Sequence, residues 1–152
     1  MMEQLANLLV SPGQGPALSL DGMTAALKAG GELTVGAFTV LECSLPPGHN
    51  GITRHLHRQT YEVFQVLEGE LMLHMGQRTV TAGPGYVALV PLGVAHAFSN
   101  ATDKPVRFLN ITSPGGYEGY LLQLAQLQAE KGTPLPPELA QELAERYDIE
   151  PA

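Results

Sequence analysis

Short apolar runs alternate with turns rich in glycine and proline along most of the first 112 residues. The runs are enriched in β-branched and aromatic residues, which is typical of strands. Glu62, Phe64 and Val66 share one parity, so we expect them to face the same side of a strand. The pattern at residues 23–28 is ambiguous. We expect strands at residues 17–20 (at a sheet edge), 33–43, 53–57, 62–67, 71–75, 78–81, 86–90, 95–100 and 106–112.

The spacing of these runs predicts a mainly β fold. Short strands at nearly even intervals, separated by Gly and Pro turns, are typical of an antiparallel sandwich or barrel. Residues 71–75 and 78–81 flank Gly76-Gln77, which predicts a hairpin. Gly36, inside the long run at residues 33–43, predicts a bend or bulge in that strand.

The pattern changes to a helical one after residues 113–116. Leu121, Leu124 and Ala125 recur at helical spacing, and a second periodic segment at residues 137–147 begins with proline. We expect two helices packed outside the barrel. A segment of about 35 residues cannot bury a core alone. The whole chain, residues 1–152, is therefore interpreted as one domain, with a barrel over about residues 17–112 and a helical extension over about residues 117–150.

Composition narrows the classes of function. The net charge is −7 and no cluster of Lys and Arg is present, so we expect no nucleic-acid binding. Cys43 is the only cysteine, which excludes an internal disulfide and fits a reducing cytosol. The N-terminus lacks a signal-peptide pattern, and no apolar run approaches the roughly 18 residues of a membrane span. We therefore expect a cytoplasmic protein with no membrane partner.

The segment from His55 to Glu62 carries the candidate chemistry. His55 and His57 are two residues apart, which places both imidazoles on one face of a strand. Glu62 follows five residues later and can return to the same place after a short bend. Imidazole nitrogen and carboxylate oxygen together are suitable ligands for a first-row divalent metal.

Two spaced blocks of residues contain this segment and a third histidine. They run Gly48-x6-His55-x-His57-x4-Glu62-x6-Gly69 and Gly85-x5-Pro91-x-Gly93-x2-His96-x3-Asn100. Together they closely resemble the two sequence motifs of the cupin superfamily, with one extra residue after the first glycine. The resemblance covers roughly residues 33–112. The sequence around the motifs is similar to that of small single-domain cupins labelled quercetin-dioxygenase-like.

The resemblance implies an antiparallel double-stranded β-helix, the jelly-roll or cupin barrel. It also implies one divalent transition metal held by His55, His57, Glu62 and His96, with Asn100 in a structural role. Three neutral imidazoles and one carboxylate leave the cation with a net charge of about +1 and open positions for water, O2 or substrate. Fe, Mn, Ni, Co and Zn all fit, and the sequence does not choose among them. Family members form homodimers, and residues 3–20, including a short helix or arm at 3–10, could serve this.

Other residues have ordinary structural roles as the first interpretation. His74 is expected to be a barrel or surface histidine. His49 is expected to be a solvent-exposed loop residue, with a role at the pocket mouth as the alternative. Cys43 is expected to be a small core residue. Tyr117, Tyr120 and Glu118 are expected to anchor a helix to the barrel, with closure of a pocket mouth as the alternative. Core packing is the first expectation for six apolar residues, and a place in a pocket wall is the alternative: Phe64, Val66, Met72, Val87, Leu89 and Phe98.

Three functions follow from the resemblance and the ligand set. The first is a metal-dependent dioxygenase acting on a small oxygenated, flavonol- or catechol-like substrate, with Glu62 as ligand and as catalytic base. The second is a non-oxidative metal-dependent isomerase or lyase, in which the ion stabilises an enolate. The absence of an inward-facing Arg or Lys in the expected barrel strands weakens sugar phosphates as its substrates. The third is a small-molecule-binding cupin without catalysis, because a fold does not determine function.

Overall fold

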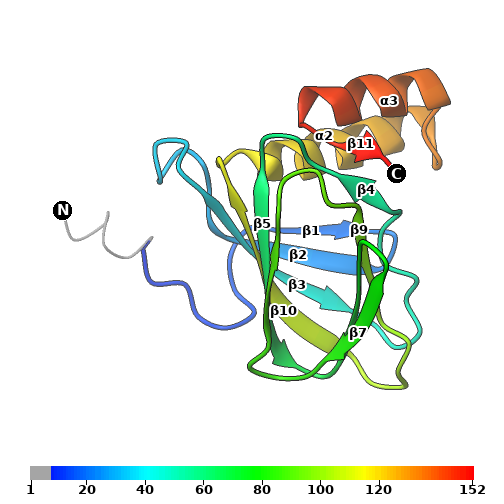
Figure 1. Cartoon of the computed structure of the whole chain (residues 1–152). Helices are drawn as coiled ribbons and strands as arrows, with labels where there is room; N and C mark the ends of the chain where they lie inside the picture. The colour runs from blue at the N-terminus through cyan, green and yellow to red at the C-terminus, as the bar shows by residue number, and fades with distance from the viewer. Residues whose placement is uncertain (1–7) are drawn as a thin grey trace.

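Two antiparallel sheets face each other in the computed structural model, which describes residues 8–152 (Figure 1). One sheet has six strands in the order β1-β2-β3-β10-β5-β8, and the other has five in the order β11-β4-β9-β6-β7. This arrangement confirms the predicted antiparallel double-stranded β-helix. The strands are β1 (Ala17–Leu20), β2 (Met23–Ala29), β3 (Thr39–Leu45), β4 (His55–Leu56), β5 (Tyr61–Glu68), β6 (Leu71–Met75), β7 (Arg78–Ala82), β8 (Val87–Val90), β9 (His96–Ser99), β10 (Val106–Ser113) and β11 (Glu150–Pro151).

Strand β5 shows how the sequence pattern selects the inner face. Glu62, Phe64 and Val66 are buried, whereas the residues between them are partly exposed, as the parity predicted. Phe64 packs against Phe98 and Phe108, with ring centroids 5.5 and 6.0 Å apart. Burial of such aromatic side chains stabilises the barrel by roughly 1.5–3 kcal/mol each. The interior is therefore a packed core at one end, and the candidate ligand Glu62 lies beyond it along the same strand.

The hairpin at residues 71–82 is confirmed, and so is the edge strand at residues 17–20. Strands β6 and β7 pair from Leu71 with Ala82 to Met75 with Arg78. Gly76 in the turn has φ +60°, a conformation that L side chains rarely adopt. Strand β1 pairs with β2 alone at one edge of the six-stranded sheet. The ambiguous segment at residues 23–28 is part of strand β2.

The long strand predicted at residues 33–43 was wrong in its first half. Strand β3 begins at Thr39, and the residues before it form turns with φ +53° at Val35 and φ +79° at Gly36. The amide of Gly36 donates to the carbonyl of Gly31, which closes the turn. The apolar composition suggested a strand, but Gly36 and local hydrogen bonds allow the backbone to fold back. The first ligand strand, predicted over residues 53–57, is likewise limited to β4, His55–Leu56.

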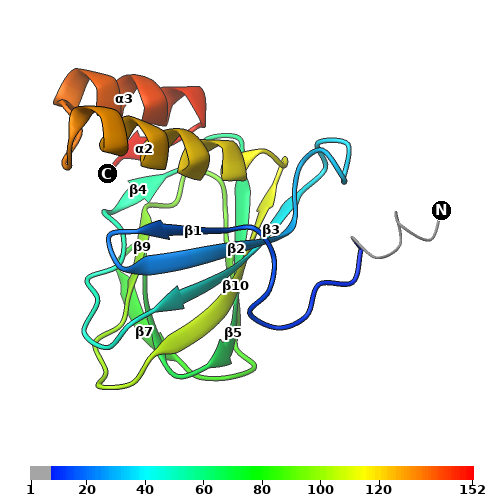
Figure 2. The same cartoon turned by 180° about the vertical axis from the view of Figure 1, so that it is seen from behind.

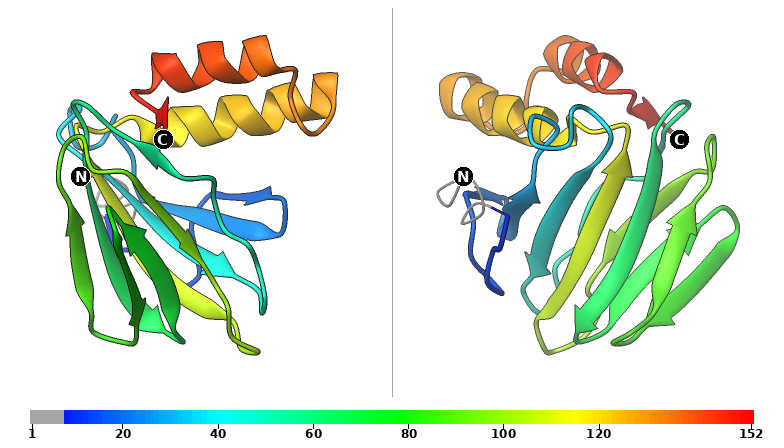
Figure 3. Two further views of the ribbon diagram at one scale, coloured as in Figure 1. Left: turned by 45° about the vertical axis from the view of Figure 1, so that its right-hand side comes forward. Right: turned by 90° about the vertical axis from the view of Figure 1, so that its left-hand side faces the viewer.

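Two helices, α2 (Tyr117–Lys131) and α3 (Pro137–Arg146), lie across one end of the barrel (Figures 2 and 3). They bury Leu121 and Leu143 respectively. Strand β11 follows them and pairs with β4, a pairing that the sequence did not predict. Of the segment predicted at residues 3–10, residues 3–7 lie outside the described residues, and residues 8–10 form no helix.

Within residues 8–152, neither helix combines the length and apolar character needed to cross a bilayer.

Candidate metal centre

The four ligands predicted from the two motifs come together between the sheets. His55 lies on β4 opposite His96 on β9, and the two residues are register partners. His57 directly follows β4, and Glu62 comes from β5 in the other sheet. One ligand atom from each of the four residues lies within 4.8 Å of the others. None of the four exposes more than 7% of its surface.

Each of the three imidazoles has its Nδ1 atom within hydrogen-bond distance of a backbone carbonyl. The Nδ1 atom of His55 lies 2.8 Å from the carbonyl of Thr53, and that of His96 lies 3.0 Å from the carbonyl of Val94. A carbonyl accepts only, so each Nδ1 carries the hydrogen. The Nε2 atom of each neutral ring then presents its lone pair to the cluster. Such outer hydrogen bonds are characteristic of metal-binding histidines.

Glu62 receives hydrogen bonds on both carboxylate oxygens. Its Oε2 atom lies 3.1 Å from Nε2 of His57 and 2.6 Å from Nε2 of His96. Its Oε1 atom accepts a 2.6 Å hydrogen bond from Nδ2 of Asn110. Burial acts to raise the pKa of Glu62, but the hydrogen bonds from His57 and His96 outweigh burial and lower the pKa well below its ordinary range. Glu62 is therefore a carboxylate, the form that binds a cation.

The histidines differ in protonation according to their contacts. Burial lowers the pKa of His55 to about 4, so this ring is neutral at neutral pH. Burial also acts to lower the pKa of His57, but the hydrogen bond and the charge of Glu62 outweigh it and raise the pKa. With Nδ1 already donating, Nε2 of His57 can donate to Glu62 only as an imidazolium. A divalent cation would supply the positive charge in place of that proton, so the donor set fits a metal ion.

Sequence reasoning missed two residues at this centre, Asn110, which donates to Glu62, and Asp148. The backbone carbonyl of Asp148 lies 2.8 Å from Nδ1 of His57. Its carboxylate accepts hydrogen bonds from the amides of Arg58 and Gln59 and from the hydroxyl of Thr60, at 2.8–2.9 Å. Burial acts to raise the pKa of Asp148, but these hydrogen bonds outweigh it and lower the pKa. Asp148 thus fixes the turn between two ligands as well as the ring of His57.

The segment after Asp148 also contacts the strand that carries His55. Strand β11 pairs Glu150 with Leu56 and Pro151 with His55. The Glu150 carboxylate also forms a bidentate ion pair with the guanidinium of Arg58, at 2.8 and 2.9 Å. Arg58 therefore faces away from the ligands in a salt bridge. No motif marks Asp148, because its contact with His57 spans 91 residues and involves a backbone atom.

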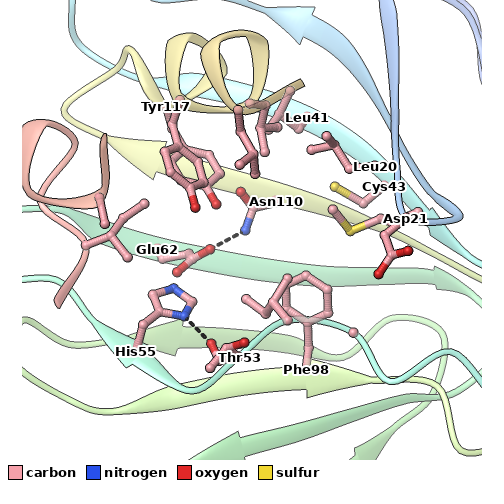
Figure 4. Close-up of a pocket in the computed structure, with 18 of the residues that line it drawn as sticks. Leu20, Asp21, Leu41, Cys43, Thr53, His55, Glu62, Phe98, Asn110 and Tyr117 are labelled. Atoms are coloured by element: carbon pink, nitrogen blue, oxygen red, sulfur yellow. Dashed lines mark hydrogen bonds between the residues drawn. The ribbon is translucent and has the colours of Figure 1, made fainter. Parts of the chain in front are cut away.

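A cavity of about 320 Å³ opens directly onto His55 and Glu62. Helix α2 forms its opposite wall with Tyr117 and Leu121, and Phe98 lies on the barrel side (Figure 4). The surface is mainly apolar, as is usual for pockets that bind small organic molecules. An atom of a bound molecule can therefore reach His55 and Glu62, two of the four candidate metal ligands, while the rest of the molecule contacts apolar walls.

Helix α2 has both of the roles expected from the sequence, because it is anchored to the barrel and it lines the cavity. Tyr117 and Tyr120 line the cavity. Glu118, which lies between the two tyrosines in the sequence, accepts hydrogen bonds from the amide of Gly31 at 2.6 Å and the hydroxyl of Thr39 at 2.5 Å. Glu118 thus anchors the helix to the barrel, and the tyrosines close the cavity.

The other candidate residues divide into structural and cavity positions. His74 bonds to Thr79, away from the ligands, and His49 lines the cavity with its Nε2 atom 2.7 Å from the carbonyl of Asp21. Cys43 is a buried core residue, and burial raises its pKa to about 12. Asn100 is structural, since its side chain bonds to three carbonyls and to Thr102.

Few of the six apolar residues considered for a pocket wall have that role, and Phe64 and Val66 pack in the core as expected. Of the six candidates, only Phe98 is among the residues that line the described cavity. Val87 and Leu89 were wrong, because they expose 62% and 54% of their surface. Ala88 and Val90 have the opposite parity on strand β8 and turn inward. An entirely apolar run does not reveal which parity faces the core.

The motifs and the fold identify the class of protein. Residues 41–112 match the family model described as "Cupin domain". The match contains all four candidate ligands, and solved cupin structures share the fold. These findings support the resemblance of residues 41–112 to the cupin superfamily.

Solved structures resemble the chain over most of the barrel. A sugar phosphate isomerase of the cupin superfamily from Silicibacter pomeroyi is 32% identical over 61% of this chain and 60% of its own, with a TM-score of 0.55. A predicted oxalate decarboxylase from Thermotoga maritima is 19% identical over 70% of this chain and 98% of its own, with a TM-score of 0.64. The polyketide cyclase RemF from Streptomyces resistomycificus is 23% identical over 69% of this chain and 78% of its own, with a TM-score of 0.60.

The last two similarities, below 25% identity, show the fold alone. The chain spans 60% of the length of the isomerase that it matches. No curated protein matches the sequence significantly.

Proposed function

We propose that this chain is a metal-dependent dioxygenase that acts on a small oxygenated substrate of the flavonol or catechol type. The observation that carries the proposal is the position of the cavity, which joins the buried ligand cluster to a mainly apolar volume of about 320 Å³. A substrate with adjacent oxygens and a flat apolar body matches both parts. In this proposal the metal is held by His55, His57, Glu62 and His96.

The residues of the chain have separate tasks in this proposal. When bound, a divalent metal would act as a Lewis acid and, if redox-active, support chemistry with O2. The three histidines hold it through Nε2, because their Nδ1 atoms donate to backbone carbonyls. Asn110 holds Glu62 in place through Oε1. The lowered pKa of Glu62 supports its role as a ligand more than its role as a catalytic base.

Oxygen consumption tests the proposal. Apoprotein loaded separately with Fe(II), Mn(II), Ni(II), Co(II) or Zn(II) is mixed with a panel of flavonols and catechols under air. We expect substrate-dependent O2 uptake with at least one redox-active metal and none with Zn(II). A His57→Ala/His96→Ala double variant is the control for adventitious metal. No metal-dependent uptake across the panel would contradict the dioxygenase assignment.

A non-oxidative isomerase is the second candidate, and the 32% identity to the Silicibacter sugar phosphate isomerase favours it. The cavity itself gives less support for a phosphorylated substrate. Arg54 is the one Lys or Arg among the described residues that line it, and its guanidinium donates to the carbonyl of Gly76 at 2.7 Å. Turnover of a hydroxy ketone under nitrogen with Zn(II) would favour this candidate. Tight binding of a metabolite without conversion would indicate a binding protein instead.

We also propose that the chain forms a homodimer. Strand β8 is a sheet edge, and it exposes the apolar side chains of Val87 and Leu89. Such an edge is usually covered or protected in native proteins. Sedimentation at micromolar concentration should give twice the mass of the chain, and a monomer would contradict the proposal.

A further inference from the structure

Tyr117, the first residue of helix α2, points its hydroxyl group into the cavity toward Glu62 (Figure 4). It comes from outside the segment that matches the cupin family model, residues 41–112. Neither motif therefore accounts for this side chain, although it faces the candidate metal centre.

The hydroxyl of Tyr117 has no hydrogen-bond partner in the part of the chain that the structure describes. Its ring stacks on Tyr120, with centroids 5.5 Å apart and an angle of 24° between the planes. Burial raises the pKa of Tyr117 well above its ordinary value, so the phenol stays protonated. The group is thus a neutral donor that faces a cavity, and a hydrogen bond from it to a bound molecule would stabilise the complex.

The position of Tyr117 is fixed by its neighbours in the helix. Glu118 accepts hydrogen bonds from Gly31 and Thr39. The amide of Gly116 also donates to the Thr39 hydroxyl, at 2.9 Å. These contacts on both sides of Tyr117 hold the start of the helix against the barrel. A donor held in place before binding loses little conformational entropy when a ligand arrives.

Asn110 provides an acceptor in the same cavity. Its amide nitrogen donates a hydrogen bond to Glu62. Its buried Oδ1 atom has no donor among the described residues. A buried acceptor without a partner destabilises the protein until a donor reaches it. A hydroxyl group on the ligand would satisfy this atom. The donor at Tyr117 and the acceptor at Asn110 together match a compound with a hydroxyl next to a carbonyl or phenolate oxygen.

We propose that Tyr117 is a substrate-binding residue whose hydroxyl donates a hydrogen bond to an oxygen atom of the substrate at the candidate metal centre. This inference rests on the proposed function, since it assumes an oxygenated substrate in this cavity. It adds that the C-terminal extension contributes directly to recognition. The substrate class is a compound with adjacent oxygens, one accepting from Tyr117 and one donating to Asn110.

The test uses 4-nitrocatechol, a coloured compound with adjacent hydroxyls, titrated into the Zn(II)-loaded full chain. Tyr117→Phe keeps the ring and removes only the hydroxyl. We expect its Kd for the probe to rise about tenfold, the effect of losing one hydrogen bond. Tyr61→Phe is the matched control, because Tyr61 precedes Glu62 but is 48% exposed. This control should bind the probe as the unmodified chain does.

Two further measurements separate binding from folding. The Kd for Zn(II) and the thermal midpoint of Tyr117→Phe should equal those of the unmodified chain. With ¹³C-labelled tyrosine, one Cζ resonance of the unmodified chain should shift on addition of the probe, and Tyr117→Phe should lack that resonance.

Equal probe affinity in Tyr117→Phe and the unmodified chain would overturn the inference and leave the proposed function standing. Failure of the Zn(II)-loaded unmodified chain to bind the probe would overturn both. A tenfold loss confined to Tyr117→Phe supports both.

Discussion

The two walls of the cavity come from different parts of the chain and differ in chemistry. The barrel wall, from residues 41–112, carries His55 and the buried carboxylate of Glu62, and the ligand atoms of His57 and His96 lie within 4.8 Å of theirs. The wall from helix α2 carries Tyr117, Tyr120 and apolar side chains such as Leu121. The barrel wall is thus suited to hold a cation, and the helical wall to contact an organic molecule.

The barrel and the C-terminal extension also depend on each other. The C-terminal extension reaches behind the barrel wall through Asp148, whose carbonyl contacts His57. Strand β11 extends the five-stranded sheet beside His55. The extension therefore has two contributions. Helix α2 lines the cavity next to the candidate ligands, and Asp148 and strand β11 contact His57 and His55.

Removal of two ligands should abolish metal binding while leaving the helical wall in place. In His57→Ala/His96→Ala, two of the three imidazoles that face the centre are absent. We expect the metal content to fall from about one ion per chain to near zero, since both rings would bind the cation directly. Elemental analysis of protein purified without chelators or affinity metal measures this. Undiminished metal content would show that the ion binds elsewhere.

Loss of the Asp148 side chain should lower the metal affinity of the site. Asp148→Ala removes the hydrogen bonds that hold the turn between His57 and Glu62. We expect metal affinity to fall about 10- to 100-fold, as for other outer-shell partners. Competition with a chromophoric chelator gives the affinity. Glu142→Ala, a change at an exposed carboxylate on helix α3, is the matched control. Equal metal affinities in the two variants would mean that the Asp148 side chain does not support the metal site, and that the extension contributes only to the cavity.

Asn110→Ala should lower the stability of the metal-free protein. The change removes a 2.6 Å hydrogen bond to the buried Glu62 carboxylate. We expect the free energy of unfolding to decrease by about 1–3 kcal/mol. Urea denaturation in the presence of a chelator measures it, with Asn50→Ala in an exposed loop as the control. A change equal to that of the control would mean that Glu62 is held by the histidines alone.

The smallest effect concerns a carboxylate of the barrel that lies outside the cavity. Glu42 is buried and contacts Lys28 and Arg107, each at 2.8 Å. Burial acts to raise the pKa of Glu42, but hydrogen bonds from Lys28, the Gly13 amide and Arg107 outweigh it, so the pKa lies below 4.5. The folded state thus binds the Glu42 proton less readily than the unfolded state does. The resulting stability is present above pH 4.5 and is lost as pH falls through the lowered pKa.

Denaturation of the apoprotein at a series of pH values tests this expectation. Glu42→Gln should show a shallower loss of stability in acid than the unmodified chain. Glu70→Gln, at an exposed position, should retain the full slope. Parallel curves for all three proteins would contradict the role assigned to Glu42.

Different parts of this structure could be predicted from the sequence to different degrees. The parity of β5 follows from alternation of Glu62, Phe64 and Val66 with more exposed residues. The convergence of the four candidate ligands was expected from spacing and resemblance. On β8 the run is apolar at every position, so parity gave no guidance for Val87 and Leu89.

The missed features depend on contacts distant in sequence. Asp148 acts on His57 through a backbone carbonyl, a group that every residue possesses. Residues 33–38 have the composition of a strand, but the turn hydrogen bond from Gly36 to Gly31 overrides it. Tyr117 was considered for the pocket mouth without a way to decide, because only the anchoring of Glu118 to Thr39 sets its direction.

The contact between His57 and Asp148 has a consequence for the order in which the centre is assembled. A ribosome makes all four candidate ligands before it makes Asp148 and strand β11, because synthesis proceeds from the N-terminus. The nascent chain thus contains a complete set of donor atoms before the carbonyl that orients one of them exists. Orientation of His57 is therefore a late event of biosynthesis.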